Sequence, residues 1–471
     1  MAETLWVKDG KFPDGYRQVA DRKAAGKQAR KNVPRSSHSH WSPAAARPDP
    51  VSLLEEQNTD RVDWLIPIRH ARMRVSPFTF YRGTARIMAS DLADTPVSGL
   101  HVQLGGDAHL SNFGAYASSE RHLVFDANDF DETLPGPWEW DLKRLATSFV
   151  VAGQHLGFKG RQQREAAEMS VMAYRQAMKD YSRQGYLDIW YDYLTPQDIA
   201  DAGGIDAAEL SKRLGRFARK AESRTSLQAM EKLTEVVDGR LQIRSDPPLL
   251  VPLRNLADQY DPAVMEHVVR RGIDDFKDTL SDDRRALLDR FIAVDIAIKV
   301  VGVGSVGTRC LIILFVGRDG QDPLFLQVKE AGDSVLAEFL QPSEYGNQGR
   351  RVVAGQRLVQ AQSDIFLGWT QGQEGRQFYV RQLRDWKGSV EVEGATAEQL
   401  SFYAALCGRT LARGHARSGD PIAISAYAGK STELDRAITD FAVTYAEQNQ
   451  QDYAAFLAAI DSGRLPVSDV F

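Results

Sequence analysis

Two short stretches rich in acids and amides, GDAHLSNFG at residues 106–114 and FDANDFDE at residues 125–132, interrupt a part of the chain that is otherwise apolar. The residues around them, LHVQLGG at 100–106 and HLVFDAND at 122–129, alternate or run apolar as strands do. Carboxylates among apolar residues are costly to bury unless they are paired or bind a metal. The two stretches therefore predict a functional site on a small β-rich segment.

The bulk composition is that of an ordinary globular protein. The chain has 471 residues, 43% of them hydrophobic, and a formal net charge of −5. One hydrophobic core stops growing at roughly 250–300 residues, so at least two lobes are expected. The charge gives no general attraction to nucleic acid or to an anionic membrane. No apolar run approaches the roughly 18 residues of a membrane helix and no signal core is visible, so we expect a cytoplasmic protein without nucleic-acid or membrane partners.

Four segments are predicted along the chain. Residues 1–60 form a basic N-terminal arm, 61–290 a large and mainly helical lobe, 291–390 a small β-rich lobe, and 391–471 helices that complete the large lobe. The arm is expected to be partly disordered, either as a solvated tail or as a docking segment for an acidic partner.

The hydrophobic spacing also predicts individual elements. Helices are expected at 139–158, 161–182, 206–235, 334–341, 344–362, 397–416 and 432–461, and a strand at 376–383. Cys310 and Cys407 lie in apolar contexts and are expected to be reduced core residues.

A glycine-rich turn lies in the β-rich part of the chain. Gly302, Gly304 and Gly307 form a G-x-G-x-x-G pattern that also contains Ser305. In a dinucleotide-binding domain the third glycine opens a helix, whereas here TRCLIILFV follows without helical spacing. The pattern favours a strand–turn–strand hairpin whose backbone amides lie over nucleotide phosphates.

Lys329 lies on the predicted strand after this hairpin, in the sequence FLQVKEA. A lysine inside an apolar strand needs an anionic partner unless it lies on an edge strand in water. In protein kinases a lysine of the third strand pairs with the nucleotide phosphates and with a helix glutamate. We therefore expect Lys329 to bind phosphate, and Glu338 is favoured over Glu344 as its glutamate partner.

The acidic stretches contain the other groups that phosphoryl transfer requires. Asp107 is expected to orient the substrate hydroxyl and accept its proton. Asn112 and Asp129 supply oxygen ligands for Mg²⁺, which keeps several waters and phosphate oxygens. Asp131 is expected either to bind metal or to cap the turn, and His109 to brace the loop through hydrogen bonds.

The order GDAHLSNFG, DFDE and PWEWDLKRLA resembles the motif series of aminoglycoside phosphotransferases and choline kinases, in the protein-kinase-like superfamily. The resemblance implies ATP and Mg²⁺ as cofactors and assigns Asp141 to the aspartate that braces the catalytic loop. Over about residues 60–460, from RMRVSPFTFYRG to FYVRQLRDWKG, the chain is also identified as a member of the DUF2252 family, whose name implies no activity.

The motifs stand in an unusual order, because the glycine turn and Lys329 follow the acidic stretches instead of preceding them. We therefore expect an α+β, bilobal, protein-kinase-like fold that is circularly permuted, which is feasible when the former termini lie close together. The helix ending in HARSGD resembles the one that normally leads into the catalytic loop. Asp420 itself does not fit that loop, since Ser425 and not Asn lies five residues later, so His415 is expected to pack at a helix end.

These expectations favour an ATP- and Mg²⁺-dependent phosphotransferase that acts on a hydroxyl of an unknown small molecule or protein. Transfer of AMP is a variant, and a nucleotide-binding pseudokinase scaffold is a second class. A metal-dependent phosphoesterase and a dinucleotide-binding oxidoreductase fit less well. The stretch SPFTFYRG and the basic residues near 212–224 fit a pocket for an anionic acceptor, although packing explains them equally well.

Overall fold

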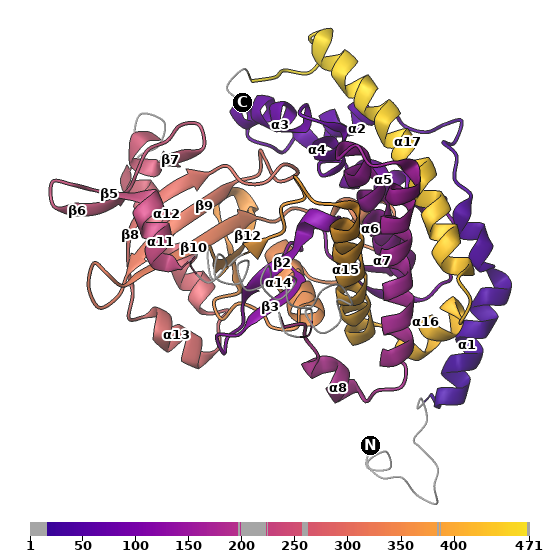
Figure 1. The fold of residues 1–471 in the computed structure, drawn as a ribbon. Helices are drawn as coiled ribbons and strands as arrows, with labels where there is room; N and C mark the ends of the chain where they lie inside the picture. The colour runs from indigo at the N-terminus through magenta and orange to yellow at the C-terminus, as the bar shows by residue number, and fades with distance from the viewer. Residues whose placement is uncertain are drawn as a thin grey trace, which may run out of the picture.

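The computed structural model describes residues 17–195, 198, 223, 225–256, 262–383, 386 and 388–468. The chain is a mixed α+β protein, as predicted, with a helical region and a sheet region that meet at the hairpin β2–β3 (Figure 1). Among the described residues no helix is long and apolar enough to cross a membrane.

The helical region is formed by the first and the last parts of the chain. Its helices are α1 (Val19–Asn32), α2 (Pro50–Asn58), α3 (Ile66–Met73), α4 (Pro77–Tyr81), α5 (Ala85–Ala93), α6 (Trp138–His155), α7 (Gly160–Tyr181), α8 (Tyr186–Tyr191), α15 (Ala397–Ser418), α16 (Pro421–Ala428) and α17 (Glu433–Asp461). Helix α6 is buried along nearly its whole length and lies against α7, α15 and α17. The rings of Trp138 on α6 and Tyr174 on α7 stack 5.5 Å apart in this core.

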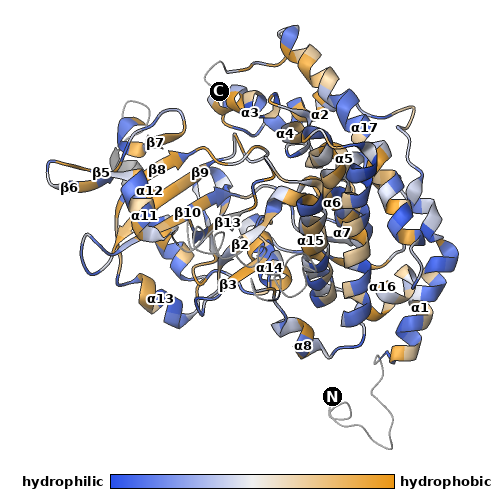
Figure 2. Ribbon diagram, in the orientation of Figure 1, coloured by the Kyte–Doolittle hydropathy of each residue, from blue (hydrophilic) through white to orange (hydrophobic). Residues whose placement is uncertain are grey.

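The sheet region contains six antiparallel strands in the order β11-β12-β10-β9-β8-β7. They are β7 (Leu250–Pro252), β8 (Ile292–Lys299), β9 (Cys310–Val316), β10 (Pro323–Glu330), β11 (Gly368–Gln371) and β12 (Gln377–Gln382), joined or covered by α11 (Ser226–Leu233), α12 (Pro262–Lys277), α13 (Asp282–Leu288) and α14 (Gln348–Val359). Figure 2 shows the mainly hydrophobic colouring of β8, β9 and β10. Strands β9 and β10 are buried on both faces, one against Phe276 and Leu288 and the other against Leu233, whereas β8 is more exposed.

Smaller strands carry the acidic stretches. Strand β1 (His101–Leu104) pairs with β4 (Leu134–Pro137), and β2 (Phe113–Ala117) pairs with both β3 (Leu123–Ala127) and β13 (Gly388–Ser389). A separate hairpin joins β5 (Thr234–Val237) to β6 (Arg240–Ile243).

Most of the predicted elements are present. The helices predicted at 139–158, 161–182, 344–362, 397–416 and 432–461 are α6, α7, α14, α15 and α17, and the strand predicted at 376–383 is β12. The helix predicted at 334–341 was wrong, because only the 3₁₀ turn Val335–Glu338 forms there. Of the helix predicted at 206–235, α11 is described, and much of the remainder lies outside the described residues.

The N-terminal arm is more ordered than predicted from residue 19 onward. Helix α1 packs on α16, and Arg22 forms an ion pair of 2.8 Å with Asp420. Further along, the guanidinium of Arg47 lies 2.6 Å from both Asp91 and Asp452. The basic residues that suggested a solvated tail are thus partly neutralised by acids of the helical region. Residues 1–16 of the arm lie outside the described part.

This packing buries His38, whose Nε2 lies 2.6 Å from the hydroxyl of Tyr427. Burial, with the charge of Lys143 adding to it, lowers the pKa of His38 to about 3. Below about pH 6.5 the imidazole of His38 takes up a proton in the unfolded chain but stays neutral in the folded chain. The free energy of unfolding therefore falls as the pH drops below about 6.5. We expect His38→Gln to remove about 1.4 kcal/mol per pH unit of this slope between pH 6.5 and 4, measured by urea unfolding.

The exposed His101 provides the control, because His101→Gln should leave the slope unchanged. Equal slopes for wild type and His38→Gln would contradict a neutral, buried histidine.

Candidate functional site

A cavity of about 670 Å³ lies where the two regions meet. The loop between β8 and β9 (residues 300–309, here the glycine loop) forms one wall. The opposite walls come from the turn at 82–86, the loop at 107–112 and the residues at 129–132, and residues 330–338 complete the lining. The cavity thus brings together most of the residues that the sequence singled out.

The side chain of Asp141 on α6 holds the loop after β1 in place. Both carboxylate oxygens of Asp141 accept backbone hydrogen bonds, from the N–H of Gly105 (2.7 Å) and of Gly106 (3.0 Å). His415, in the last turn of α15, places its Nε2 3.2 Å from the same carboxylate. Gly106 has a φ of 84°, and a Cβ there would lie 2.2 Å from the carbonyl oxygen of Glu132. These contacts hold the loop that presents Asp107 to the cavity.

Within this loop Asp107 is oriented from two sides. Arg144 of α6 donates from Nε to Asp107 Oδ1 at 2.5 Å, and the amide of Asn112 donates to the Asp107 carbonyl at 2.8 Å. His109 accepts from the N–H of Ser111 through Nδ1, and its Nε2 lies 3.7 Å from Asp107 Oδ2. Burial lowers the pKa of His109 to about 3, although Asp107 opposes the shift. His109 is therefore a neutral residue that hydrogen-bonds within the loop.

Asn112 and Asp129 lie at the same end of the β2–β3 hairpin, because the N–H of Asn128 donates to the Asn112 carbonyl at 2.9 Å. Asp129 Oδ1 is buried and has no hydrogen-bond partner. An amide oxygen and an unpartnered carboxylate oxygen fit Mg²⁺, which takes its remaining oxygens from water and phosphate. Among the described residues, no three His, Cys, Asp or Glu side chains are grouped to hold a metal by themselves.

Lys329 approaches the cavity from the sheet and contacts two carboxylates that line it. It lies on β10 with β9 on one side and β12 on the other, so the alternative of a lysine on an exposed edge strand is wrong. Its side chain is 3% exposed, and its Nζ lies 2.6 Å from Asp131 and 3.5 Å from Asp129. Burial disfavours the charged lysine, but the two carboxylates outweigh it and raise the pKa of Lys329.

Asp131 has a protein partner on each oxygen. Tyr379 of β12 donates to Oδ1 at 2.6 Å, while Lys329 and Ser305 donate to Oδ2 at 2.6 Å and 3.1 Å. Burial by itself would raise the pKa of Asp131, but Lys329 and Tyr379 lower it to about 2. Asp131 was predicted to bind metal or to cap the turn, whereas its contacts make it the anionic partner of Lys329.

The predicted glutamate partner of Lys329 is not at its side. Glu338 lines the cavity but pairs with Arg86 at 2.9 Å. Helix α14, which follows the lysine strand, has the sequence QGRRVVAGQRLV and contains no acid. The carboxylates beside Lys329 are therefore Asp131 and Asp129, which sequence reasoning had assigned to metal binding.

The glycine loop joins two strands, as predicted, and β9 follows Gly307 directly where a dinucleotide-binding fold needs a helix. Residues 61–83 hold this loop. Val62 N–H donates to the Gly307 carbonyl at 2.8 Å, Arg72 donates to the Gly302 carbonyl at 2.5 Å, and Arg61 donates to the Val306 carbonyl. Nothing in the glycine pattern itself pointed to these arginines, because they lie more than 200 residues earlier.

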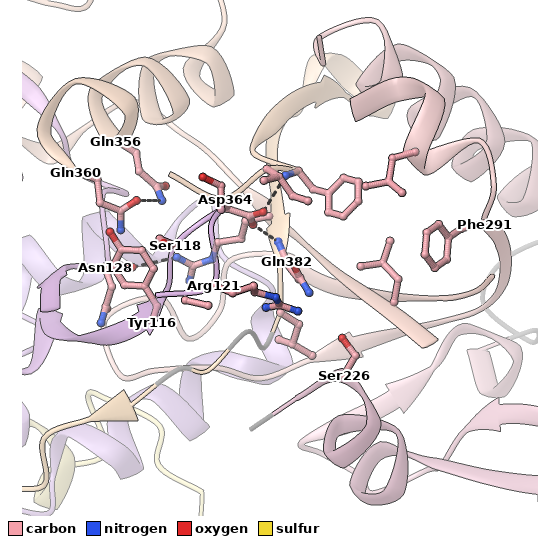
Figure 3. A pocket seen from close by; sticks show the side chains of 18 of the residues that line it. Tyr116, Ser118, Arg121, Asn128, Ser226, Phe291, Gln356, Gln360, Asp364 and Gln382 are labelled. Carbon is pink, nitrogen blue, oxygen red and sulfur yellow. Dashed lines mark hydrogen bonds between the residues drawn. The ribbon is translucent and has the colours of Figure 1, made fainter. Parts of the chain in front are cut away.

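A second cavity of about 290 Å³ lies beside the first (Figure 3). In Figure 3 the carboxylate of Asp364 accepts from the N–H of Gln382 at the end of β12, and Gln356 donates to Gln360 on the opposite side. The two cavities adjoin at one peptide, since Asn128 lines the smaller and Asp129 the larger. Arg381 donates to the Asn128 carbonyl at 3.0 Å and so ties this peptide to the sheet.

Fold and site together define an α+β protein with a polar cavity, two of whose carboxylates, between β3 and β4, contact a buried lysine of the sheet. The chain belongs to the DUF2252 family, described as uncharacterized protein conserved in bacteria, whose family model matches residues 61–459. No curated protein and no solved structure matches the chain.

Proposed function

We propose that the protein is an ATP- and Mg²⁺-dependent phosphotransferase with a circularly permuted, kinase-like arrangement. One observation carries the proposal. Lys329 pairs with Asp131 from 198 residues further along the chain, and Asp131 lines the same cavity as Asp129 and the glycine loop. Two motif sets that are distant and in reversed order in the sequence thus share one site, which is what a permuted kinase requires.

The sheet region supports this reading. In protein kinases the glycine-rich loop precedes the lysine strand, which is the third strand. Here β8, the glycine loop, β9 and β10 follow one another, and Lys329 lies on β10, the third strand of that run.

The end of α15 supports the permutation. Ser418, its last residue, accepts a hydrogen bond from the N–H of Gln103 in β1 at 3.0 Å. Strand β1 leads directly into the loop of Asp107. The helix that would precede the catalytic loop in an unpermuted chain therefore ends beside that loop, although 315 residues separate Gln103 from Ser418.

The residues of the cavity have distinct roles in this proposal. Asn112 and Asp129 would hold the Mg²⁺, Lys329 and the glycine loop would face the phosphates, and Asp107 would accept the proton of the acceptor hydroxyl. The nucleotide supplies the phosphoryl group, and the metal neutralises charge on its oxygens. Transfer of AMP or a scaffold role would use the same residues, and product analysis distinguishes them.

Thermal unfolding with and without Mg²⁺–ATP tests the proposal. Nucleotide at 100 times its Kd should stabilise the wild type by about 2.7 kcal/mol, a rise of a few degrees that disappears with EDTA. Asp129→Asn should abolish most of the rise. Because this change also removes one of the two carboxylates beside Lys329, the rise is measured from the melting temperature of each unliganded variant. Asp60→Asn, an exposed carboxylate on the same cavity, is the matched control. No rise with any nucleotide would exclude the proposal.

A further inference from the structure

Arg82 lies in the turn between α4 and α5, directly under the glycine loop. A Cβ at Gly304 would lie 3.0 Å from the Arg82 carbonyl oxygen, so loop and turn are in close contact. Arg82 lines the cavity, and Asp107, Glu393 and Asp129 are the acids that act on its charge. Arg82 thus lines the same cavity as Asp107 and Asp129.

Most of the other charges of the cavity are paired. Pairs form between Asp107 and Arg144 (2.5 Å), Asp131 and Lys329 (2.6 Å), Glu56 and Arg86 (2.7 Å), Glu338 and Arg86 (2.9 Å), and Glu330 and Arg376 (2.9 Å). Asp60 and Asp333 are exposed to water.

Arg82 differs from these residues. Its Nε is buried without a partner, and its guanidinium donates no hydrogen bond to any residue that the structure describes. Arg61 also has a buried Nε without a partner, but it donates to Val306. Among the described residues that line the cavity, Asp129 Oδ1 accepts no hydrogen bond, although Lys329 Nζ lies 3.5 Å away, and the guanidinium of Arg82 donates none.

An unpaired, half-buried arginine destabilises a protein unless a ligand pairs with it. The rigid fork of a guanidinium matches two oxygens of a phosphate and binds them with charge-assisted hydrogen bonds. The Asp129 oxygen that accepts no hydrogen bond would face a cation, and the donors of Arg82 would face an anion. A metal-bound phosphate satisfies both.

We infer that Arg82 forms a phosphate-binding subsite next to Asp129, which takes the terminal phosphate of the bound nucleotide. The assignment of this phosphate to a nucleotide rests on the proposed function. A phosphate carried by the acceptor would bind Arg82 through the same hydrogen bonds. Neither the glycine-loop motif nor the acidic motifs include this residue.

Calorimetric titration tests the subsite with four probes: Mg²⁺–ATP, AMP, tripolyphosphate, and inorganic phosphate added to protein saturated with Mg²⁺–ATP. Arg82→Gln should weaken binding of Mg²⁺–ATP and tripolyphosphate by about 10- to 100-fold and leave AMP unchanged. Arg82→Lys keeps the charge without the fork and should lie between wild type and Arg82→Gln. Arg161→Gln, at an exposed arginine paired with Glu165 on α7, should match wild type.

Unfolding without ligand separates this role from a structural one. A residue that binds no protein group should not contribute to stability, so Arg82→Gln should melt at the wild-type temperature or above it. A clear fall in melting temperature together with unchanged affinities would overturn the subsite.

Three other outcomes distinguish the subsite from the proposed function. Arg82-dependent binding of inorganic phosphate alone would keep the subsite and assign it to the acceptor. Arg82-dependent binding of tripolyphosphate without any nucleotide binding would keep the subsite and exclude the proposed function. Wild-type affinities of Arg82→Gln for all probes would exclude the subsite and leave the proposed function standing.

Discussion

Replacing Lys329 by methionine should destabilise the protein by about 3–5 kcal/mol, even without any ligand. Methionine fills a similar volume but leaves the buried carboxylate of Asp131 without its cation, 2.6 Å from where Nζ lies now. Breaking a buried ion pair by removing one partner is costly, because the remaining charge has lost its solvent and its counter-ion. Chemical denaturation at pH 7 measures the loss.

The double variant Lys329→Met with Asp131→Asn should recover much of this stability, because no charge remains unpaired. The pKa of Asp131 is lowered to about 2 in the folded protein, so its contribution is complete above about pH 4 and is lost as the pH falls toward 2. The difference between wild type and Asp131→Asn should shrink over the same range. Additive effects of the two single variants would contradict a direct pair.

Replacing Asp107 by asparagine should lower the rate of transfer by about 10²–10⁴-fold, the usual contribution of a general base. Asparagine keeps the shape of the side chain and can still accept the hydrogen bond from Arg144, but it cannot take up a proton. Affinity for Mg²⁺–ATP should change little, since Asn112 and Asp129 remain. Formation of ADP from ATP measures the rate, and calorimetric titration measures the affinity.

Asp60→Asn should retain the wild-type rate in the same assay. If Asp107→Asn retains it as well, proton transfer does not pass through this residue. If affinity falls together with the rate, Asp107 acts in binding and not as a base.

Local pattern was enough to predict most of the elements around the site. The apolar run from residue 310 could only be a strand, and that excluded a dinucleotide-binding helix after Gly307. The position of Lys329 within an apolar strand indicated a buried charge, and the structure places it on the central strand β10.

Partners that depend on tertiary geometry were not predictable in the same way. Glu338 was favoured over Glu344 as the partner of Lys329, yet it pairs with Arg86, and Asp131 pairs with the lysine. Arg144 and Tyr379 orient the site from α6 and β12, and both look like ordinary helix and strand residues in the sequence. Arg82 lies in SPFTFYRG, a stretch that the sequence offered as the lining of a pocket for an anionic acceptor but that packing explained equally well.

The pairing of the first helix with the last ones has a consequence for how the protein is made. Arg22 of α1 meets Asp420, which lies 398 residues later, and the acids of the cavity meet Lys329 198 residues after they are synthesised. At 5–20 residues per second, the acidic loops leave the ribosome roughly 10–40 seconds before their lysine does. During that time the nascent chain holds unpaired carboxylates beside apolar strands. The helical region closes only when translation is nearly complete, so this protein should depend on chaperones more than a chain whose lobes are contiguous.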